Sequence, residues 1–446
     1  MNYRYCARIL LEATTPLKIG TGEAGIITDE LVATDANGLP IIPGTALTGV
    51  LRHAFKDEAK IKDIFGFQER REGKGSRIII SNANFVGKDG NVIDGLADID
   101  FSDDFYKKFK MLPVRDHTKI TEKGVADSAA RGKFDEQIVY KGCRFVFDME
   151  LKGDNKDSKI WEEILNKLSS PFFRLGSGTR KGFGELKIVK LDQEIFDLTH
   201  DASKYMGRSS KLAMPQKGFQ FRTIPDDQLI VYELRLKADD FFIFSSGYGD
   251  AEADAVGKRE PYIYWKDDKP SFSEEEILIP ASSIKGAISH RTAFHYNRLS
   301  GHFADQIPTN EHKKYVGENN LAVRTLFGYA KNSEEDKNYG QRGRVIFSDL
   351  FIQSVGEKIF EHVAIDRFTG GAIDGALFNE KVNYTDEDIN LKILVEKNSA
   401  IEDERIIEAF ECTLKDIATG MLPLGGNVMR GHGCFTGKVF KNGKEI

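Results

Sequence analysis

Two glycine-rich segments hold the residues with the clearest potential for chemistry. One reads LGSGTRKGFG at 175–184 and the other LGGNVMRGHG at 424–433. Glycine lets a backbone approach a phosphate closely because no Cβ intervenes, and nearby donors and cations add affinity. A tight turn before a strand would explain the same glycines without a ligand. The residues that we predict to contact phosphate are Gly176, Ser177, Thr179, Arg180, Lys181, Asn427, Arg430 and His432.

Further basic residues lie on an expected linker and on expected helices. Residues 202–225 contain Lys204, Arg208 and Lys211 and no acidic residue, so they fit either a plain tether or a phosphate-contacting segment. Arg52 and Lys285 lie on expected helices of the two halves, where solvated basic residues are also common. We include all five among the candidate nucleic-acid contacts.

The two halves of the chain share four landmarks in the same order, which indicates an internal duplication. A strand enters a loop at 17–22 and again at 242–247. A proline loop then precedes a helix, as IIPGTALTG at 41–49 and LIPASSIKG at 278–286. An aromatic-glycine pair and a strand follow in each half, and the glycine-rich segments come last.

This order of elements predicts the fold class. Strands and helices mix within each half in a way that favours an antiparallel α+β fold over a doubly wound parallel sheet. We expect a first domain at 1–200, a basic linker at 201–228 and a second domain at 229–446. The expected helices cover residues 45–62, 158–169, 281–299 and 402–419.

The composition is that of an ordinary globular protein. Of the 446 residues, 40% are hydrophobic and 30% are charged, and there is no apolar run of about 18 residues. The N-terminus has no signal-peptide core, so we expect a cytoplasmic protein without membrane contact. The four cysteines are Cys6, Cys143, Cys412 and Cys434, and they form no CxxC pair, so we expect neither disulfides nor a structural zinc site.

The net charge of −6 hides an asymmetry between the halves. Residues 1–225 hold 36 Lys and Arg against 32 Asp and Glu, a net of +4. Residues 226–446 hold 27 against 37, a net of −10. Differently solvated domain faces would explain this, as would preferential contact of nucleic acid with the first half.

The combination of motifs resembles the RAMP superfamily of CRISPR proteins, in particular the backbone subunit of type III RNA-guided effector complexes. The shared outline is a glycine-rich loop, an IPG(S/T)xLxG-like segment with its helix, and a late GxGxxxGxG loop. VAIDRFTGGA at 363–372 and GALFNEKV at 375–382 are similar to the family's thumb hairpin. Residues 114–120 and 129–139 form a diverged copy. A tandem of this kind resembles subunits of type III-D-like complexes.

The resemblance implies two ferredoxin-like (RRM-like) palms in tandem, each with an inserted thumb. Such subunits stack along guide RNA (crRNA), and each thumb displaces a base pair between guide and target RNA. In active members a loop aspartate supports cleavage of the target RNA with a divalent metal, here expected to be Mg²⁺ or Mn²⁺. Expected partners are guide RNA, target RNA, other RAMP backbone subunits, a large polymerase-like subunit and small subunits.

The family pattern also implies positions for the catalytic acids. In the first half, Asp29 matches by its distance to Val32 and to the following proline loop. The corresponding loop of the second half departs from the family spacing, so Asp254 and Asp250 are both candidates. An inactive second loop is the alternative.

For the thumbs, the resemblance implies an exposed wedge beside the displaced base pair. We expect Ile120 and Phe368 to be the wedges, and Phe134 and Phe378 to be buried anchors. A salt bridge between Asp366 and its neighbour is expected at the base of the second thumb. The full set of expected thumb residues is Arg115, His117, Ile120, Arg367, Phe368 and Thr369.

Two further functions remain open at this point. The chain could be an RNA-binding scaffold without an active site. It could also be a guide-processing endoribonuclease centred on His53 or His290, which lie at matching positions of the first helix in each half. A histidine on a helix is more often structural, which disfavours the second alternative.

Overall fold

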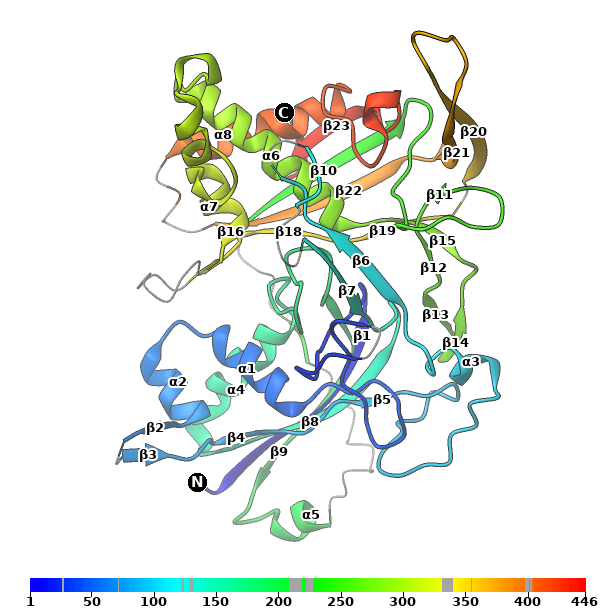
Figure 1. The fold of residues 1–446 in the computed structure, drawn as a ribbon. Coiled ribbons are helices and arrows are strands. Elements are labelled where there is room, and N and C mark those ends of the chain that lie inside the picture. The colour runs from blue at the N-terminus through cyan, green and yellow to red at the C-terminus, as the bar shows by residue number, and fades with distance from the viewer. Residues whose placement is uncertain are drawn as a thin grey trace.

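A computed structural model describes the chain except for residues 26–27, 71, 122–123, 128–131, 208–218, 222–227, 331–339, 354, 398–400 and 402. Each half of the chain builds one five-stranded antiparallel sheet with helices packed against it, and smaller sheets and hairpins extend from both (Figure 1). We call the two sheets with their helices the first and second palm.

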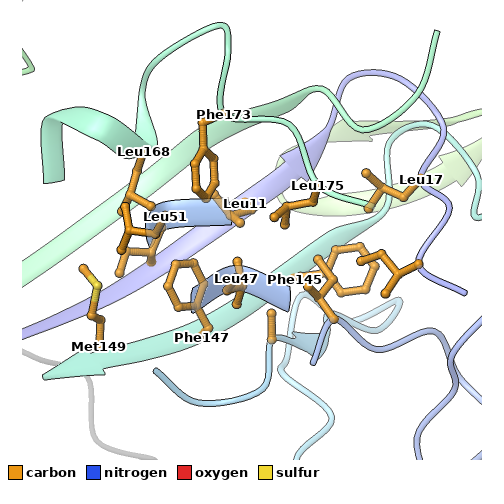
Figure 2. Close-up of a cluster of buried hydrophobic side chains, with 14 of the residues drawn as sticks. Leu11, Leu17, Leu47, Leu51, Phe145, Phe147, Met149, Leu168, Phe173 and Leu175 are labelled. Carbon is orange, nitrogen blue, oxygen red and sulfur yellow. The ribbon is translucent and has the colours of Figure 1, made fainter. Parts of the chain in front are cut away.

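The first palm has the strand order β4-β8-β1-β9. Its strands are β1 (Tyr3–Ala13), β4 (Ile78–Ile80), β8 (Arg144–Gly153) and β9 (Leu186–Asp197), and β5 (Asn84–Phe85) also pairs with β8. Buried residues alternate along β8, as expected where one face of a sheet is covered. Helices α1 (Gly44–His53) and α4 (Ser158–Leu168) cover that face. Figure 2 shows Leu47 and Leu51 of α1 among the core residues Leu11, Phe147 and Leu168.

The second palm repeats this arrangement with the order β18-β22-β10-β23-β24. Its strands are β10 (Leu229–Ala238), β18 (Val345–Phe347), β22 (Ile389–Glu396), β23 (Phe435–Lys441) and β24 (Lys444–Glu445). Its helices are α6 (Ala281–Leu299), α7 (Leu321–Phe327) and α8 (Glu404–Ala418). In both palms the first strand lies between the third and the last, which is the ferredoxin-like order. The predicted tandem α+β duplication is therefore confirmed.

A hairpin projects from each palm at the position predicted for a thumb. The first thumb consists of β6 (Val114–Thr118) and β7 (Lys133–Gln137), and the second of β20 (Gly356–Ile365) and β21 (Ala372–Tyr384). The first thumb lies between the two palms, whereas the second extends away from the body of the molecule (Figure 1).

The second half also sends a hairpin into the core of the first palm. This hairpin, β13 (Ile263–Lys266) with β14 (Lys269–Phe272), brings Phe272 against Phe105, Phe109 and Tyr140. The indole N–H of Trp265 donates to the Gly142 carbonyl oxygen at 2.7 Å. The two palms are thus joined by packed apolar side chains as well as by polar contacts.

One expected helix is divided in two. The predicted helix at 45–62 forms α1 and then α2 (Glu58–Phe65), because the Asp57 carboxylate accepts the N–H groups of Ala59 and Lys60 and so begins a new helix. The predicted helices at 158–169, 281–299 and 402–419 correspond to α4, α6 and α8.

The remaining elements are short and mainly connect or extend these units. No helix in the described part of the chain is long and apolar enough to cross a membrane. The short strands are β2 (Phe67–Glu69), β3 (Glu72–Lys74), β11 (Ala255–Val256), β12 (Arg259–Glu260), β15 (Glu276–Ile279), β16 (Gly328–Tyr329), β17 (Gln341–Arg342) and β19 (Leu350–Ile352). The short helices are α3 (Asp104–Lys107), α5 (Ala202–Met206), η1 (Asn155–Asp157), η3 (Ala304–Gln306), η4 (Thr309–Tyr315), η5 (Gly317–Asn319) and η6 (Val428–Arg430).

Candidate nucleic-acid interface

The loop that carries Asp29 is tied to the first thumb by two reciprocal hydrogen bonds. The Asp29 N–H donates to Oδ1 of Asp135 at 2.7 Å, and the Asp135 N–H donates to Oδ2 of Asp29 at 3.1 Å. Asp135 belongs to β7, so the position of the loop depends on the thumb strand. The Asp29 carboxylate itself stays exposed to solvent.

The second half contains the same arrangement at Asp254. The Asp254 N–H donates to Oδ1 of Asn379 at 2.8 Å, and the Asn379 N–H donates to Oδ2 of Asp254 at 3.0 Å. Asn379 lies on β21 of the second thumb, at the position that Asp135 has on β7. Asp254 is therefore the structural counterpart of Asp29.

Asp250 has a different environment from Asp29. Its carboxylate accepts the N–H groups of Glu252 and Ala253 and contacts Lys381 Nζ at 2.6 Å. The hydrogen bond from Lys381, with those from the two backbone N–H groups, lowers the pKa of Asp250 to about 2. Asp250 thus shapes its own loop, which favours Asp254 over Asp250 as the second catalytic candidate.

These contacts predict that Asp135 positions the Asp29 loop through an acceptor oxygen and not through its charge. Asp135→Asn keeps an oxygen for the Asp29 N–H, as Asn379 does in the second half, so we expect the RNA cleavage that the resemblance implies next to Asp29 to persist. Asp135→Ala removes that acceptor, which is worth about 1 kcal/mol, so cleavage there should slow by about fivefold. Site-resolved product mapping measures both variants. An equal loss of cleavage rate in Asp135→Asn and Asp135→Ala would contradict a purely positioning role for Asp135.

A buried glutamate links each thumb to its palm. In the first half, Glu136 contacts His117 at 2.6 Å and Lys181 at 3.2 Å, and it also pairs with Lys18. Burial by itself would raise the pKa of Glu136, but the hydrogen bond from His117, the charge of Lys181 and the hydrogen bond from Lys18 lower it overall. His117 also stacks on Phe134, with ring centroids 5.0 Å apart.

The second half uses Glu380 in the same way. Glu380 contacts His362 of the thumb at 2.8 Å and His432 of the glycine-rich segment at 3.0 Å, and it accepts a hydrogen bond from Asn427. His362 stacks on Phe378, with ring centroids 4.8 Å apart. Sequence reasoning missed both glutamates and His362, although each glutamate follows the predicted thumb aromatic by two residues.

These networks change the interpretation of several predicted phosphate contacts. His432 is buried, and its Nε2 contacts Glu380 rather than a surface where phosphate could bind. Asn427 also forms a hydrogen bond with Glu380, whereas Arg430 remains exposed and lies 3.7 Å from the same carboxylate.

The phenyl rings expected to be buried anchors, Phe134 and Phe378, are only half-buried.

The first glycine-rich segment packs tightly against the first palm. A Cβ on Gly176 would lie 2.1 Å from the carbonyl oxygen of Lys18, and Gly176 has a φ of +82°. The Ser177 N–H donates to that same oxygen at 2.8 Å. Close packing in a turn therefore accounts for Gly176, while Thr179 lies half-buried farther along the loop.

Arg180 and Arg115 are buried between the two palms and do not face solvent. Arg180 donates from Nε to the Gly343 carbonyl oxygen at 2.8 Å, and burial lowers its pKa to about 10. Arg115, on β6 of the first thumb, pairs with Glu260 and Asp349 of the second half at 2.6 Å each. The second palm encloses both guanidinium groups. The predicted phosphate contact at Arg180 is therefore wrong, and so is the predicted exposed role of Arg115 in the thumb.

The tips of both thumbs are exposed to solvent, unlike the parts of the thumbs that lie against the palms. Phe368 is 99% exposed and Ile120 is 48% exposed, as a wedge requires. The Asp366 carboxylate accepts the N–H groups of Phe368 and Thr369, so it shapes the turn at the tip. The expected salt bridge with Arg367 at the thumb base is thus replaced by a tip turn that presents Arg367, Phe368 and Thr369 to solvent.

A groove of about 620 Å³ separates the first thumb from the second palm. The side of α6 that carries Ser283 and His290 lines it, opposite His117 and Lys119 of the first thumb segment. Lys258 adds a further positive charge. The N-terminus of α6, with its partly positive end, lies in the same wall, so the groove suits an anionic strand.

Lys285 lies on α6 beside this groove and is half-buried. Burial, together with the charges of Lys181 and Arg180, lowers the pKa of Lys285 to about 8. Lys285 is therefore mostly charged at pH 7 and mostly neutral at pH 9. We expect RNA affinity to fall over this range, and to fall less in Lys285→Arg, whose guanidinium stays charged. Binding isotherms at constant ionic strength test this, and equal pH dependence in both proteins would contradict it.

The other predicted basic contacts have mixed positions. Arg52 is exposed near the end of α1, and Lys204 on α5 pairs with Glu194 of β9. Arg208 and Lys211 lie outside the described residues. No cluster of three or more metal-ligating side chains occurs within the described ranges. The exposed Asp29 and Asp254 carboxylates nevertheless suit Mg²⁺, which proteins bind through one or two carboxylates together with substrate phosphates and water.

A family model described as the RAMP superfamily matches residues 10–187 and 272–436, which is well over half of the chain. The chain belongs to the RAMP superfamily. No curated protein matches it significantly. Membership in this superfamily makes the chain an RNA-binding subunit of a CRISPR effector. The two matched stretches of this RAMP protein contain both thumbs and both glycine-rich segments, but they leave out residues 188–271, which include the loop of Asp254. The position of Asp254 as the second loop acid therefore comes from the hydrogen bonds to Asn379.

Proposed function

We propose that this RAMP protein is a guide-RNA-binding backbone subunit of a type III effector that also cleaves target RNA, with Asp29 and Asp254 as the catalytic acids. The observation that carries the proposal is the repetition of one local geometry. In each half an exposed loop carboxylate is held by reciprocal hydrogen bonds to the thumb strand. A thumb that displaces a nucleotide therefore has an acid attached at its base.

The residues of the chain can supply the main requirements of RNA cleavage through the 2′-hydroxyl. The exposed ring of Phe368 can stack on or replace a base, which frees the neighbouring nucleotide from A-form stacking. Asp29 or Asp254 can then accept the proton of the 2′-hydroxyl as its oxygen attacks the phosphorus. The bond from phosphorus to the 5′-oxygen breaks, which leaves a 2′,3′-cyclic phosphate and a 5′-hydroxyl that takes its proton from water. A bound Mg²⁺ or Mn²⁺ would stabilise the negative charge that develops on the phosphate.

The proposal also includes a path for the guide RNA. The groove between the first thumb and the second palm is lined by Lys119, Lys258 and His290. Because backbone contacts dominate such binding, affinity should fall steeply as salt rises and should depend little on guide sequence. Guide pairing supplies the sequence specificity.

A reconstituted complex tests the proposal. The chain is assembled with guide RNA and its partner subunits, and end-labelled complementary RNA is added with Mg²⁺ or with a chelator. We expect regularly spaced cuts that require the metal and disappear in Asp29→Asn/Asp254→Asn, while guide and target binding persist. Cuts that survive in this double variant would identify the chain as a scaffold. Cleavage of precursor guide RNA by the isolated chain without metal would instead support guide processing.

A further inference from the structure

The buried glutamates at the bases of the two thumbs have different kinds of cationic partner. Glu136 and Glu380 occupy equivalent positions, because each directly follows the residue that holds the loop acid of its half. Both side chains are completely buried. A buried carboxylate is costly unless charged or hydrogen-bonding groups satisfy it. The partners of each glutamate therefore decide how firmly its thumb strand is held against the palm.

In the first half, two lysines supply most of the positive charge. Lys18 of the first palm is buried and pairs with Glu136, and Lys181 of the glycine-rich segment lies 3.2 Å from the same carboxylate. Burial by itself would lower the pKa of Lys18, but its hydrogen bonds to Glu136 and Glu30 raise it overall. Lysine ordinarily stays charged up to about pH 10. Glu136 therefore keeps cationic partners when His117 is neutral.

The second half has no lysine at the position of Lys18. Ile243 stands there instead, as the backbone contacts show. The Ser177 N–H donates to the carbonyl oxygen of Lys18 at 2.8 Å, and the Gly426 N–H donates to that of Ile243 at 2.8 Å. The buried cation of the first half is thus replaced by an apolar side chain.

Two histidines replace the missing lysine. His362 of β20 lies 2.8 Å from Oε1 of Glu380, and His432 lies 3.0 Å from the same oxygen. His432 aligns with Phe183 of the first glycine-rich segment, so this second histidine occurs only in the half that lacks the lysine. Both imidazoles point Nε2 at one buried carboxylate.

The other groups around Glu380 leave its charge to be balanced mainly by these histidines. Asn427 donates a neutral hydrogen bond, and the guanidinium of Arg430 lies 3.7 Å away. Arg430 is exposed, so solvent screens its charge. The remaining contacts of His432 are with aromatic rings, those of Phe241 and Phe360.

The next residue along β21 has its own partners. Lys381 pairs with Asp250 and Glu252, each at 2.6 Å. Side chains alternate between the faces of a strand, so this group lies on the face opposite Glu380. The charge of Lys381 is therefore already matched by two acids and does not replace that of the histidines.

The charge of the histidines depends on pH in the physiological range. Burial by itself would raise the pKa of Glu380, but the hydrogen bonds and charges of His432 and His362 lower it overall, so Glu380 is ionised near neutral pH. Histidine ordinarily titrates near pH 6.5. A protonated imidazole adds Coulomb attraction to its hydrogen bond, and burial strengthens that attraction. This part of the stabilisation is present at pH 6 and is lost as the pH rises to 8.

We propose that His362 and His432 are positioning residues of the second site, which hold the second thumb strand more firmly when they are protonated. Asn379 precedes Glu380 on β21 and accepts the Asp254 N–H, so a firmly held strand also fixes the Asp254 loop. The first site is held through lysines and does not respond to pH in this range. The effect on cleavage rests on the proposed function, whereas the hold on the thumb is a property of the chain itself.

Hydrogen exchange of the full chain without RNA measures this hold directly. Exchange is compared at pH 6 and pH 8 after correction for its intrinsic pH dependence. We expect the amides around Glu380 to lose protection by about tenfold between pH 6 and pH 8, while those around Glu136 keep theirs. Equal changes around the two glutamates would overturn the proposal.

Three variants make the test specific. His362→Gln/His432→Gln keeps neutral N–H donors for Glu380, so its protection at both pH values should equal that of the wild type at pH 8. Glu380→Gln removes the negative charge instead and should also abolish the pH dependence, which provides a second test if the double variant folds poorly. His302→Gln changes a histidine that stacks on Tyr315, and it should respond to pH like the wild type. Persistence of the pH dependence in the first two variants would overturn the proposal.

The reconstituted complex tests the effect on cleavage. The ratio of the cut assigned to Asp254 to the cut assigned to Asp29 cancels the pH dependence that the two reactions share. We expect this ratio to fall between pH 6 and pH 8 in the wild type, by no more than the loss of protection, and to stay constant in His362→Gln/His432→Gln. A constant ratio in the wild type would overturn the positioning role. Absence of every cut would count against the proposed function, and the exchange experiment would then decide whether the histidines hold the thumb.

Discussion

Asp29→Asn is expected to remove one of the regularly spaced cuts in target RNA and leave the others unchanged. The substitution removes the negative charge but keeps an amide oxygen that can accept the Asp135 N–H, so the loop should hold its position. Loss of a general base typically slows a reaction by about 10²–10⁴-fold. Asp254→Asn should remove a different cut for the same reason, because Asn379 holds its loop in the same way. Mapped products of end-labelled RNA separate these effects.

Matched controls lie in the same two loops. Glu23→Gln changes another exposed acid of the first loop, and it should leave every cut in place. Asp250→Asn retains an acceptor for the N–H groups of Glu252 and Ala253, so it should also preserve cleavage. Loss of the second cut in Asp250→Asn but not in Asp254→Asn would reverse our assignment. Retention of every cut in both Asp29→Asn and Asp254→Asn would contradict an enzymatic role for the chain.

Arg115→Ala is expected to destabilise the protein by about 3–5 kcal/mol, a large share of the stability of a typical domain. The Arg115 guanidinium forms two hydrogen bonds with Glu260, at 2.8 and 2.6 Å, and a third with Asp349 at 2.6 Å. Burial alone would lower the pKa of Arg115, but the charges of Asp349 and Glu260 more than offset it and raise the pKa overall. Removing the guanidinium leaves the buried Asp349 carboxylate without this counter-ion and leaves Glu260 with Lys258 at 3.9 Å. Denaturant unfolding measures the loss.

Two companion variants distinguish this buried network from an ordinary ion pair. Arg8→Ala breaks a partly exposed pair with Asp148 and should cost less than about 1 kcal/mol. Arg115→Met combined with Glu260→Gln and Asp349→Asn should recover much of the lost stability, because no charge is then left unpaired. In the first half Asn82 already accepts the Gly44 N–H, as Asp349 accepts the Ala281 N–H, so asparagine can replace Asp349 in this contact. A loss in Arg115→Ala no larger than in Arg8→Ala would contradict the role of Arg115 as the central ion of the junction.

The sequence predicted what depends on local pattern and on repetition. The order of strands, the proline loops, the glycine-rich segments and the second thumb recur as short motifs, so each could be recognised without knowing its neighbours. The exposed tip at Phe368 also follows from its own turn, because the Asp366 carboxylate that shapes it is only two residues away.

Only the tertiary structure decided which of the chemically suitable residues face solvent. Arg180 and Arg115 have the charge to bind phosphate, but the second palm encloses both, and sequence spacing carries no information about that burial. Glu136 and Glu380 appear unremarkable in the sequence until the thumbs bring them against histidines of other segments. The choice of Asp254 over Asp250 likewise depends on Asn379, 125 residues away along the chain. Duplication and local pattern therefore determined the architecture. The contacts between distant segments determined the function of each side chain, because burial and hydrogen bonding arise only when those segments pack together.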